Sequence, residues 1–167
     1  TSGRTPLIVG IMAKKDEHGG KVAQQDYSES MNAPLGVTRR YNLTFREGVT
    51  NVKTQLERSG FDIVLDFDVK EYLGTKMKNM PNHLILLICN RDMASELIAK
   101  DVQASILFPC RVTIKEVMDE SVVEVSVEDI SVTWSPYLKK SVGGTVKKVQ
   151  ETLIKVLDHI GPMNVKL

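Results

Sequence analysis

Two cysteines have the most chemical promise in this 167-residue sequence. Cys89 ends an unbroken apolar run, and the following Asn90 can cap a helix. The N–H groups at a helix start favour a thiolate over a thiol. Cys110 opens a later apolar segment, so the two sulfurs could meet if their segments are neighbouring strands. Cys89, Cys110 and Asn90 therefore form a candidate thiol or ligand site. The alternatives are two buried apolar thiols, redox or persulfide chemistry, and another ligand role.

Histidines do not add a metal site to this pair. His18, His83 and His159 are scattered along the chain. His83 begins the apolar run that Cys89 ends, which puts them roughly 20 Å apart along an extended strand. The spacing of the two cysteines also matches no two-cysteine redox turn and no structural zinc pattern. We expect neither a metal nor a cofactor.

Other polar motifs give no catalytic assignment. Asp62, Asp66 and Asp68 alternate with apolar residues, which predicts carboxylates that face solvent. Gly143 and Gly144 resemble a phosphate-binding turn but lack the Lys-Ser/Thr pair of a P-loop. No catalytic residue is assigned, and a role other than that of an enzyme is favoured.

Overall charge gives no reason to expect a nucleic-acid partner. The 22 Lys and Arg residues nearly balance 21 Asp and Glu residues, for a net charge of +1. Short basic clusters at 39–40, 139–140 and 147–148 are interpreted as solvated surface. The longest apolar run, Leu84 to Cys89, is far shorter than the roughly 20 residues of a spanning helix. We expect no membrane-spanning segment, while peripheral membrane association stays open.

Residues 1–38 differ in character from the rest and are expected to form an N-terminal arm. A short apolar patch is followed by a polar stretch, and Leu7, Ile8 and Ile11 are candidate partner contacts. The sequence starts at Thr1 without Met, which indicates either that a targeting peptide has been removed or that the sequence has been trimmed. The predicted location is the mitochondrion, with the cytoplasm as the alternative.

Residues 39–167 have the rhythm of one α/β domain. Hydrophobic residues make up 42% of the chain, enough for a packed core. Predicted strands cover 41–45, 61–67, 84–89, 111–117 and 122–127, and predicted helices cover 49–56, 69–77, 93–98 and 146–160. The expected fold is α+β, with one compact mixed β-sheet and helices packed mainly on one face.

Trp134 and Tyr137 stand in a loop that also contains Pro136, between the hairpin and the last helix. Aromatic side chains often dominate protein interfaces, so both are candidate partner contacts. Packing of the same rings over the chain's own core is the alternative.

Four segments in this order resemble the domain of unknown function 302 family. They are 60–70 (GFDIVLDFDVK), 86–90 (LLICN), 107–112 (LFPCRV) and 123–129 (VEVSVED). The resemblance covers about residues 41–129. It implies a compact α/β fold that tends to self-associate, with Cys89 and Cys110 in family-typical positions and no agreed activity.

The chain departs from that family pattern at several places. Arg91 and Ile130 stand where the family often has proline, and neither the arm nor the 131–141 segment has a counterpart. The leading hypothesis is a non-catalytic accessory subunit whose arm and aromatic loop contact other protein subunits. The alternative is a small homodimer that handles a ligand or a sulfur species through Cys89 and Cys110.

Overall fold

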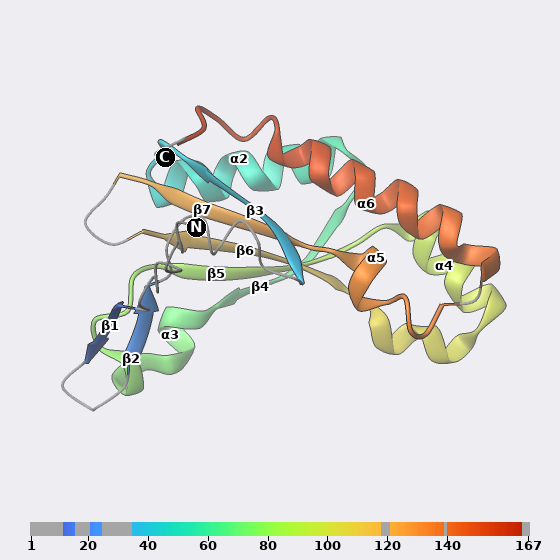
Figure 1. Cartoon of the computed structure of the whole chain (residues 1–167), viewed down its shortest axis with the longest axis horizontal. Helices are drawn as coiled ribbons and strands as arrows, with labels where there is room; N and C mark the ends of the chain where they lie inside the picture. The colour runs from blue at the N-terminus through green and yellow to red at the C-terminus, as the bar shows by residue number, and fades with distance from the viewer. Residues whose placement is uncertain (1–11, 16–20, 25–34, 118–120, 139, 165–167) are drawn as a thin grey trace, which may run out of the picture.

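The computed structural model describes residues 12–15, 21–24, 35–117, 121–138 and 140–164. Within these residues, five strands form one sheet in the order β3-β7-β6-β5-β4 (Figure 1). The strands are β3 (Gly36–Tyr41), β4 (Asp62–Asp68), β5 (His83–Cys89), β6 (Cys110–Glu116) and β7 (Val123–Glu128). The α+β class expected from the sequence is confirmed.

All neighbouring strands of this sheet pair antiparallel, whereas a mixed sheet was expected. Alternating strands and helices usually signal parallel neighbours joined by crossovers. Here the chain begins at one edge with β3 and crosses to the opposite edge with β4. The strands β5, β6 and β7 then fill the sheet inward until β7 pairs with β3. The two strands joined by that crossover run in the same direction but are not neighbours, so no parallel pair forms.

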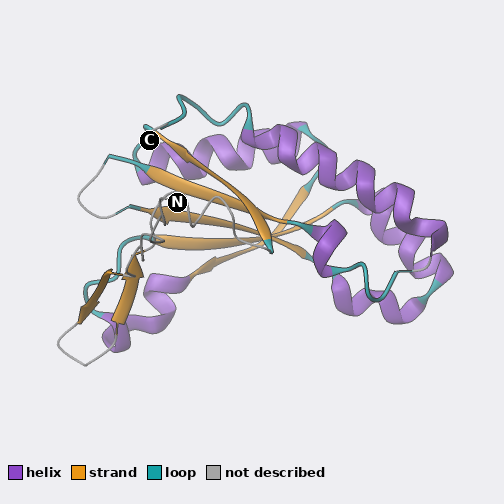
Figure 2. Cartoon of the chain, in the orientation of Figure 1, coloured by secondary structure: helices purple, strands orange, loops and turns teal. Residues whose placement is uncertain are grey.

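Helices α2 and α6 pack side by side against one face of the sheet (Figure 2). The α-helices are α2 (Phe45–Arg58), α3 (Val69–Leu73), α4 (Arg91–Lys100), α5 (Ile130–Thr133) and α6 (Gly143–Leu157). Short 3-10 turns are η1 (Gly74–Met77), η2 (Val102–Leu107) and η3 (Lys140–Val142). The amphipathic helix expected near the C-terminus is α6.

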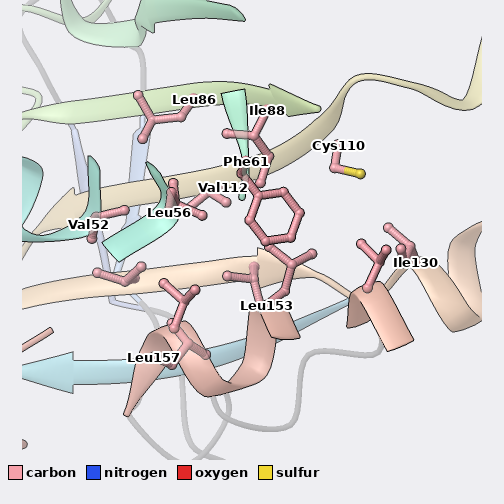
Figure 3. Close-up of a cluster of buried hydrophobic side chains, with 14 of the residues drawn as sticks. Val52, Leu56, Phe61, Leu86, Ile88, Cys110, Val112, Ile130, Leu153 and Leu157 are labelled. Carbon is pink, nitrogen blue, oxygen red and sulfur yellow. The ribbon is translucent and has the colours of Figure 1, made fainter. Parts of the chain in front are cut away.

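The hydrophobic core lies between this face and the two helices. Leu86 and Ile88 of β5 and Val112 of β6 meet side chains of α2 and α6 (Figure 3). The helix residues drawn against them are Val52, Leu56, Leu153 and Leu157. All of these side chains are buried. Because successive strand residues point to opposite faces, each strand contributes only every second residue to this core.

Helix α2 begins earlier than the periodicity predicted, and the strand expected over 41–45 is wrong. The backbone N–H of Glu47 donates to the Thr44 side chain, and the Glu47 carboxylate accepts from the Thr44 N–H. This reciprocal capping box starts a helix at the position where alternation alone indicated a strand. The strand of this region is β3, which ends at Tyr41.

The N-terminal segment contributes a separate two-stranded antiparallel sheet, β1 (Met12–Lys15) with β2 (Lys21–Gln24). The candidate contacts Leu7, Ile8 and Ile11 lie outside the described residues. Strand β3 begins at Gly36, slightly ahead of the boundary expected after residue 38.

The C-terminal end of α6 is tied to β3 by a buried hydrogen bond. The hydroxyl of Tyr41, which is fully buried, donates to the backbone carbonyl of Leu157. Beyond the helix, the N–H of Asn164 donates to the Arg40 carbonyl at 2.8 Å. The edge strand and the last helix therefore stabilise each other.

The substitution Tyr41→Phe should lower the free energy of unfolding by about 1–2 kcal/mol, because the Leu157 carbonyl loses a buried donor. Urea unfolding followed by circular dichroism measures this change. Tyr137→Phe is the matched control, since the Tyr137 side chain is exposed, and its effect should stay within about 0.5 kcal/mol. Equal effects of the two substitutions would contradict the assignment.

Candidate functional site

The sheet has a second face, which we define as the side opposite α2 and α6. Residues paired across neighbouring strands point to the same side, so the ladder assigns each side chain to a face. Ile88 is opposite Cys110, and both belong to the core face. Cys89 is the next residue along β5 and is opposite Asp62, so both point to the second face.

The two cysteines lie on neighbouring strands but on opposite faces of the sheet. Cys110 is fully buried at one end of the core cluster, on the side of Ile130 (Figure 3). Cys89 is partly buried. Both are free thiols. The sheet backbone therefore stands between the two sulfurs, which is a poor arrangement for redox exchange between them.

Both thiols are held in the protonated form. Burial raises the pKa of Cys89, and the Asp62 carboxylate beside it adds to the rise. Burial also raises the pKa of Cys110, with a further contribution from Glu128. The N-terminal end of α4 does not reverse the rise of the Cys89 pKa. The Asn90 side chain already caps this end, because it accepts from the Met93 N–H at 3.0 Å. Neither thiol has the depressed pKa that a reactive cysteine needs.

Alkylation of the folded protein at pH 7 should therefore be slow at both cysteines. Cys89 should react more slowly than a free cysteine peptide at the same pH, because its raised pKa leaves a smaller fraction of thiolate. Cys110 should be labelled only on unfolding, since it is fully buried. Mass spectrometry of iodoacetamide-treated protein resolves the two sites. Rapid labelling of Cys89 near neutral pH would contradict the electrostatic argument.

Charged residues cross the second face in a row that spans three strands. Arg40 of β3 donates to Glu124 of β7 at 2.8 Å, and Lys115 of β6 lies 2.9 Å from the other carboxylate oxygen. Burial alone would raise the pKa of Glu124, but Lys115 and Arg40 outweigh it and hold that pKa below its ordinary value. Glu124 is only 5% exposed, so its carboxylate is a buried charge between two partly exposed cations.

His83 of β5 continues this row, opposite Lys115. Burial lowers the pKa of His83, and the positive charge of Lys115 lowers it further, while Asp68 and Glu124 oppose both effects. The folded state therefore favours neutral imidazole. Since the unfolded chain binds a proton near pH 6.5, stability should fall as the pH drops through and below that value.

The substitution His83→Gln should flatten the dependence of unfolding free energy on pH between 7.5 and 5.5. The measurement is a series of urea unfolding curves across that range. His159→Gln, at an exposed position, is measured alongside as the comparison variant. An unchanged slope in His83→Gln would show that the histidine does not titrate as its surroundings indicate.

Trp134 does not reach the surface, although it was a candidate partner contact. The ring is 2% exposed, and its Nε1–H donates to Glu128 at 3.1 Å. The hydroxyl of Thr133 donates to the same carboxylate oxygen at 2.8 Å. Trp134 thus anchors the short helix α5 to the end of β7, as the core-packing alternative required. Tyr137, three residues later, is 69% exposed and remains available to a partner.

The second face is apolar on its β4–β5 side. We define the apolar half by Leu65, Phe67, Tyr72, Ile85 and Leu87. Leu65 lies opposite Leu87, and Phe67 lies opposite Ile85. The ring of Phe67 contacts that of Tyr72 from α3, with centroids 5.2 Å apart and planes tilted by 55°. Leu65 and Tyr72 are largely exposed, and the other three are half-buried.

A β-bulge shapes the edge of this apolar half. The register shifts between Ile63 and Leu65, so Val64 has no partner of its own in the ladder. Its side chain is exposed. A bulge twists an edge strand and redirects its side chains. It also makes β4 a poorer template for adding another strand, which favours contact through the face of the sheet over contact through its edge.

Other site classes find no support among the residues that the structure describes. They contain no group of three or more His, Cys, Asp or Glu side chains placed to hold a metal ion. In the same residues, no helix is both long and apolar enough to cross a bilayer.

Comparison with known proteins fits this fold. The sheet and helices define an α+β domain, and the family model of the domain of unknown function DUF302 matches residues 37–160. The chain belongs to this family. The match covers the segments that carried the resemblance in the sequence together with the last helix. No curated protein matches the sequence.

A solved structure shares the fold. It is the crystal structure of an uncharacterized conserved DUF302 protein from Bacillus stearothermophilus, with a TM-score of 0.68 and 16% sequence identity. The similarity covers 77% of this chain and 99% of that chain. At this identity, the likeness concerns the fold alone.

Sequence analysis missed the charged row and the apolar half. Alternation in 123–128 did indicate that Glu124 and Ser126 share a face opposite Val123 and Val125. It carried no information on which strands lie beside them. The bonds from Arg40 and Lys115 to Glu124 depend on the order β3-β7-β6, which only the tertiary structure supplies.

Proposed function

We propose that this chain is a non-catalytic interaction domain, an accessory subunit that docks on another protein through the apolar half of its second face. The observation that carries the proposal is the exposure of Leu65 and Tyr72 beside half-buried Phe67, Ile85 and Leu87. Antiparallel sheets usually present a polar second face to water. Here the β3-β7-β6 side is polar, although Glu124 on it is buried, and the β4–β5 side is apolar.

The apolar half has the features of a protein-binding surface. Contiguous exposed apolar residues commonly mark sites of association. Phe67 and Tyr72 supply aromatic area, which interfaces use more than other surfaces do. An ion pair flanks the patch, with Arg91 and Asp62 2.8 Å apart, and Asp62 belongs to the second face. This pair places polar groups at one border of the apolar half.

The residues of the apolar half that belong to β5 are held by the packed core behind the strand. Strand β5 lies between β4 and β6, and its core-side residues Leu86 and Ile88 are fully buried. The second-face residues Ile85 and Leu87 are therefore held in place by the core behind them. A partner that packs on them does not need to order a flexible loop, which lowers the entropic cost of binding.

Partner identity and location stay predictions. The partner class is another protein subunit, with a second copy of this chain as the other outcome of the test. The mitochondrial location predicted from the sequence stays a prediction, and fractionation of source cells tests it.

The double variant Leu65→Ser, Tyr72→Ser should weaken association at least tenfold, because truncating buried interface anchors commonly costs more than 1–2 kcal/mol. Native mass spectrometry of the tagged full chain, gently extracted from its source, identifies the complex and its stoichiometry. Titration with the purified partner then gives the affinity of each variant. Ile106→Ser with Tyr137→Ser, at exposed positions elsewhere, is the matched control and should bind normally.

Two results would contradict the proposal. One is a chain that runs only at its own mass in the extract. The other is a complex that the Leu65 and Tyr72 substitutions leave unchanged while circular dichroism shows both proteins folded. A complex containing two copies and no other protein would replace the accessory-subunit proposal with a homodimer.

A further inference from the structure

The outer edge of β3 carries the beginning of a further strand. Beyond α6, Met163 forms an isolated antiparallel bridge with Tyr41, the last residue of β3. The next residue continues the pairing, since the Asn164 N–H donates to the Arg40 carbonyl at 2.8 Å. The chain after α6 therefore returns along the outer side of β3 and runs in the opposite direction to it.

These bonds indicate which main-chain groups of β3 face outward. In an antiparallel ladder the N–H and C=O of one residue point to the same side, and successive residues alternate between sides. The Arg40 carbonyl and the Asn42 N–H both bond to the returning chain, so they point away from β7. By the same alternation, the N–H and C=O of Thr38 point away from β7. The Leu35 carbonyl belongs to the other set and accepts from the Asp129 N–H, directly after β7.

Thr38 needs an acceptor for its outward N–H. The residue is only 2% exposed, although it belongs to an edge strand. Its carbonyl accepts from Arg39 Nη1 at 2.9 Å, which leaves the second acceptor site of that oxygen, and its hydroxyl lies 2.7 Å from the Ser126 hydroxyl. Among the residues that the structure describes, none supplies an acceptor for the N–H. A buried donor without an acceptor is destabilising, so the edge needs a further partner.

The end of the sequence has the pattern of that partner. Residues 163–167 read Met-Asn-Val-Lys-Leu, with apolar and polar side chains in strict alternation. The first two of them are described and pair with Tyr41 and Arg40, while residues 165–167 lie outside the described residues. This alternation is typical of a strand with one face on a core and the other toward water.

Continued in the same register, each of the last three residues reaches a residue of β3. One step forward along one antiparallel strand is one step back along the other, which sets Lys166 opposite Thr38. The carbonyl of Lys166 then accepts from the Thr38 N–H. Val165 and Leu167 fall on the face of α2 and α6, beside Val37, which packs against the core. Lys166 falls on the polar side, so the alternation of the segment fits the two faces of the sheet.

We propose that residues 163–167 form a sixth strand that closes the β3 edge in the folded chain. The segment is the occupant of this edge because its first two residues already pair there. The three residues that follow Asn164 are the number that the register needs to reach Val37. An open edge offers its N–H and C=O groups to a strand of another chain. The sixth strand occupies those groups and so prevents association of two chains edge to edge.

The two edges of the sheet are then protected in different ways. The bulge at Val64 makes β4 a poor template for another strand, and the C-terminal segment covers β3. This inference is independent of the proposed function, because β3 and the apolar half lie at opposite ends of the strand order. It leaves the face of β4 and β5 open to a protein partner.

Hydrogen exchange of the Thr38 amide, followed by NMR on the full chain, tests the pairing. In the unmodified chain this amide should exchange slowly, because it donates to Lys166. Removal of residues 165–167, or the substitution Lys166→Pro, should speed its exchange about fivefold or more, which corresponds to the loss of one hydrogen bond. Proline has no N–H for the Thr38 carbonyl and therefore weakens the pair.

Two controls separate main-chain pairing from other effects. Lys166→Ala keeps the N–H and should leave the exchange of the Thr38 amide unchanged. The Arg39 amide points toward β7, so it should stay slow in every variant. Far-UV circular dichroism should show that all variants keep the fold, because the changes lie beyond the last helix.

Sedimentation velocity at increasing protein concentration tests the protection of the edge. All chains in this experiment carry Leu65→Ser and Tyr72→Ser, so that association through the apolar half does not contribute. The chain that ends at Asn164 should associate as its concentration rises, because its β3 edge is open. Lys166→Ala in the same background should stay a monomer.

Three results would overturn the pairing. They are exchange of the Thr38 amide in the unmodified chain at the rate of an unstructured peptide, unchanged exchange after truncation, and equal acceleration in Lys166→Ala and Lys166→Pro. A truncated chain that stays a monomer at every concentration would overturn the protective role of the strand. None of these outcomes depends on partner binding through Leu65 and Tyr72, so each proposal can fail alone.

Discussion

The alternation of side chains along β5, β6 and β7 is the constraint on which the rest of the structure depends. Each of these strands buries every second residue against α2 and α6, as Leu86 and Ile88 do on β5. The remaining residues must point to the second face. A shift of one residue in any pairing would exchange the two sets and place Glu124 and Lys115 in the hydrophobic core. Burial on one face therefore fixes what the other face displays.

This constraint explains why the thiols do not act together. Cys110 and Cys89 come from neighbouring strands, but the ladder pairs Cys110 with Ile88, one residue short of Cys89. One sulfur is therefore committed to the core and the other to the second face. Burial then disfavours the thiolate at both positions. The same strand pairing that brings β5 and β6 together places their two thiols on opposite faces of the sheet.

The two sides of the second face differ in which side chains meet across neighbouring strands. On the β3-β7-β6 side, Glu124 is held between Arg40 and Lys115, which compensates the cost of its burial. On the β4–β5 side, Leu65 and Leu87 face each other without a charged group between them. The charged groups on the β3-β7-β6 side bond to one another, whereas the β4–β5 side exposes apolar side chains. That difference is the basis of the association that we propose for the apolar half.

The sequence by itself determined the α+β class and most of the strands and helices, because periodicity depends only on neighbours along the chain. It misplaced the strand before α2, where the structure has β3 ending at Tyr41. It also determined the amphipathic helix α6 and the hairpin of β6 and β7. Only the tertiary structure decided the antiparallel order of strands, the opposite faces of Cys89 and Cys110, and the burial of Trp134 against Glu128. Each of these depends on which segments distant in sequence become neighbours. Residue spacing along the chain does not indicate which distant segments pair, since strand pairing depends on the packing of all elements together.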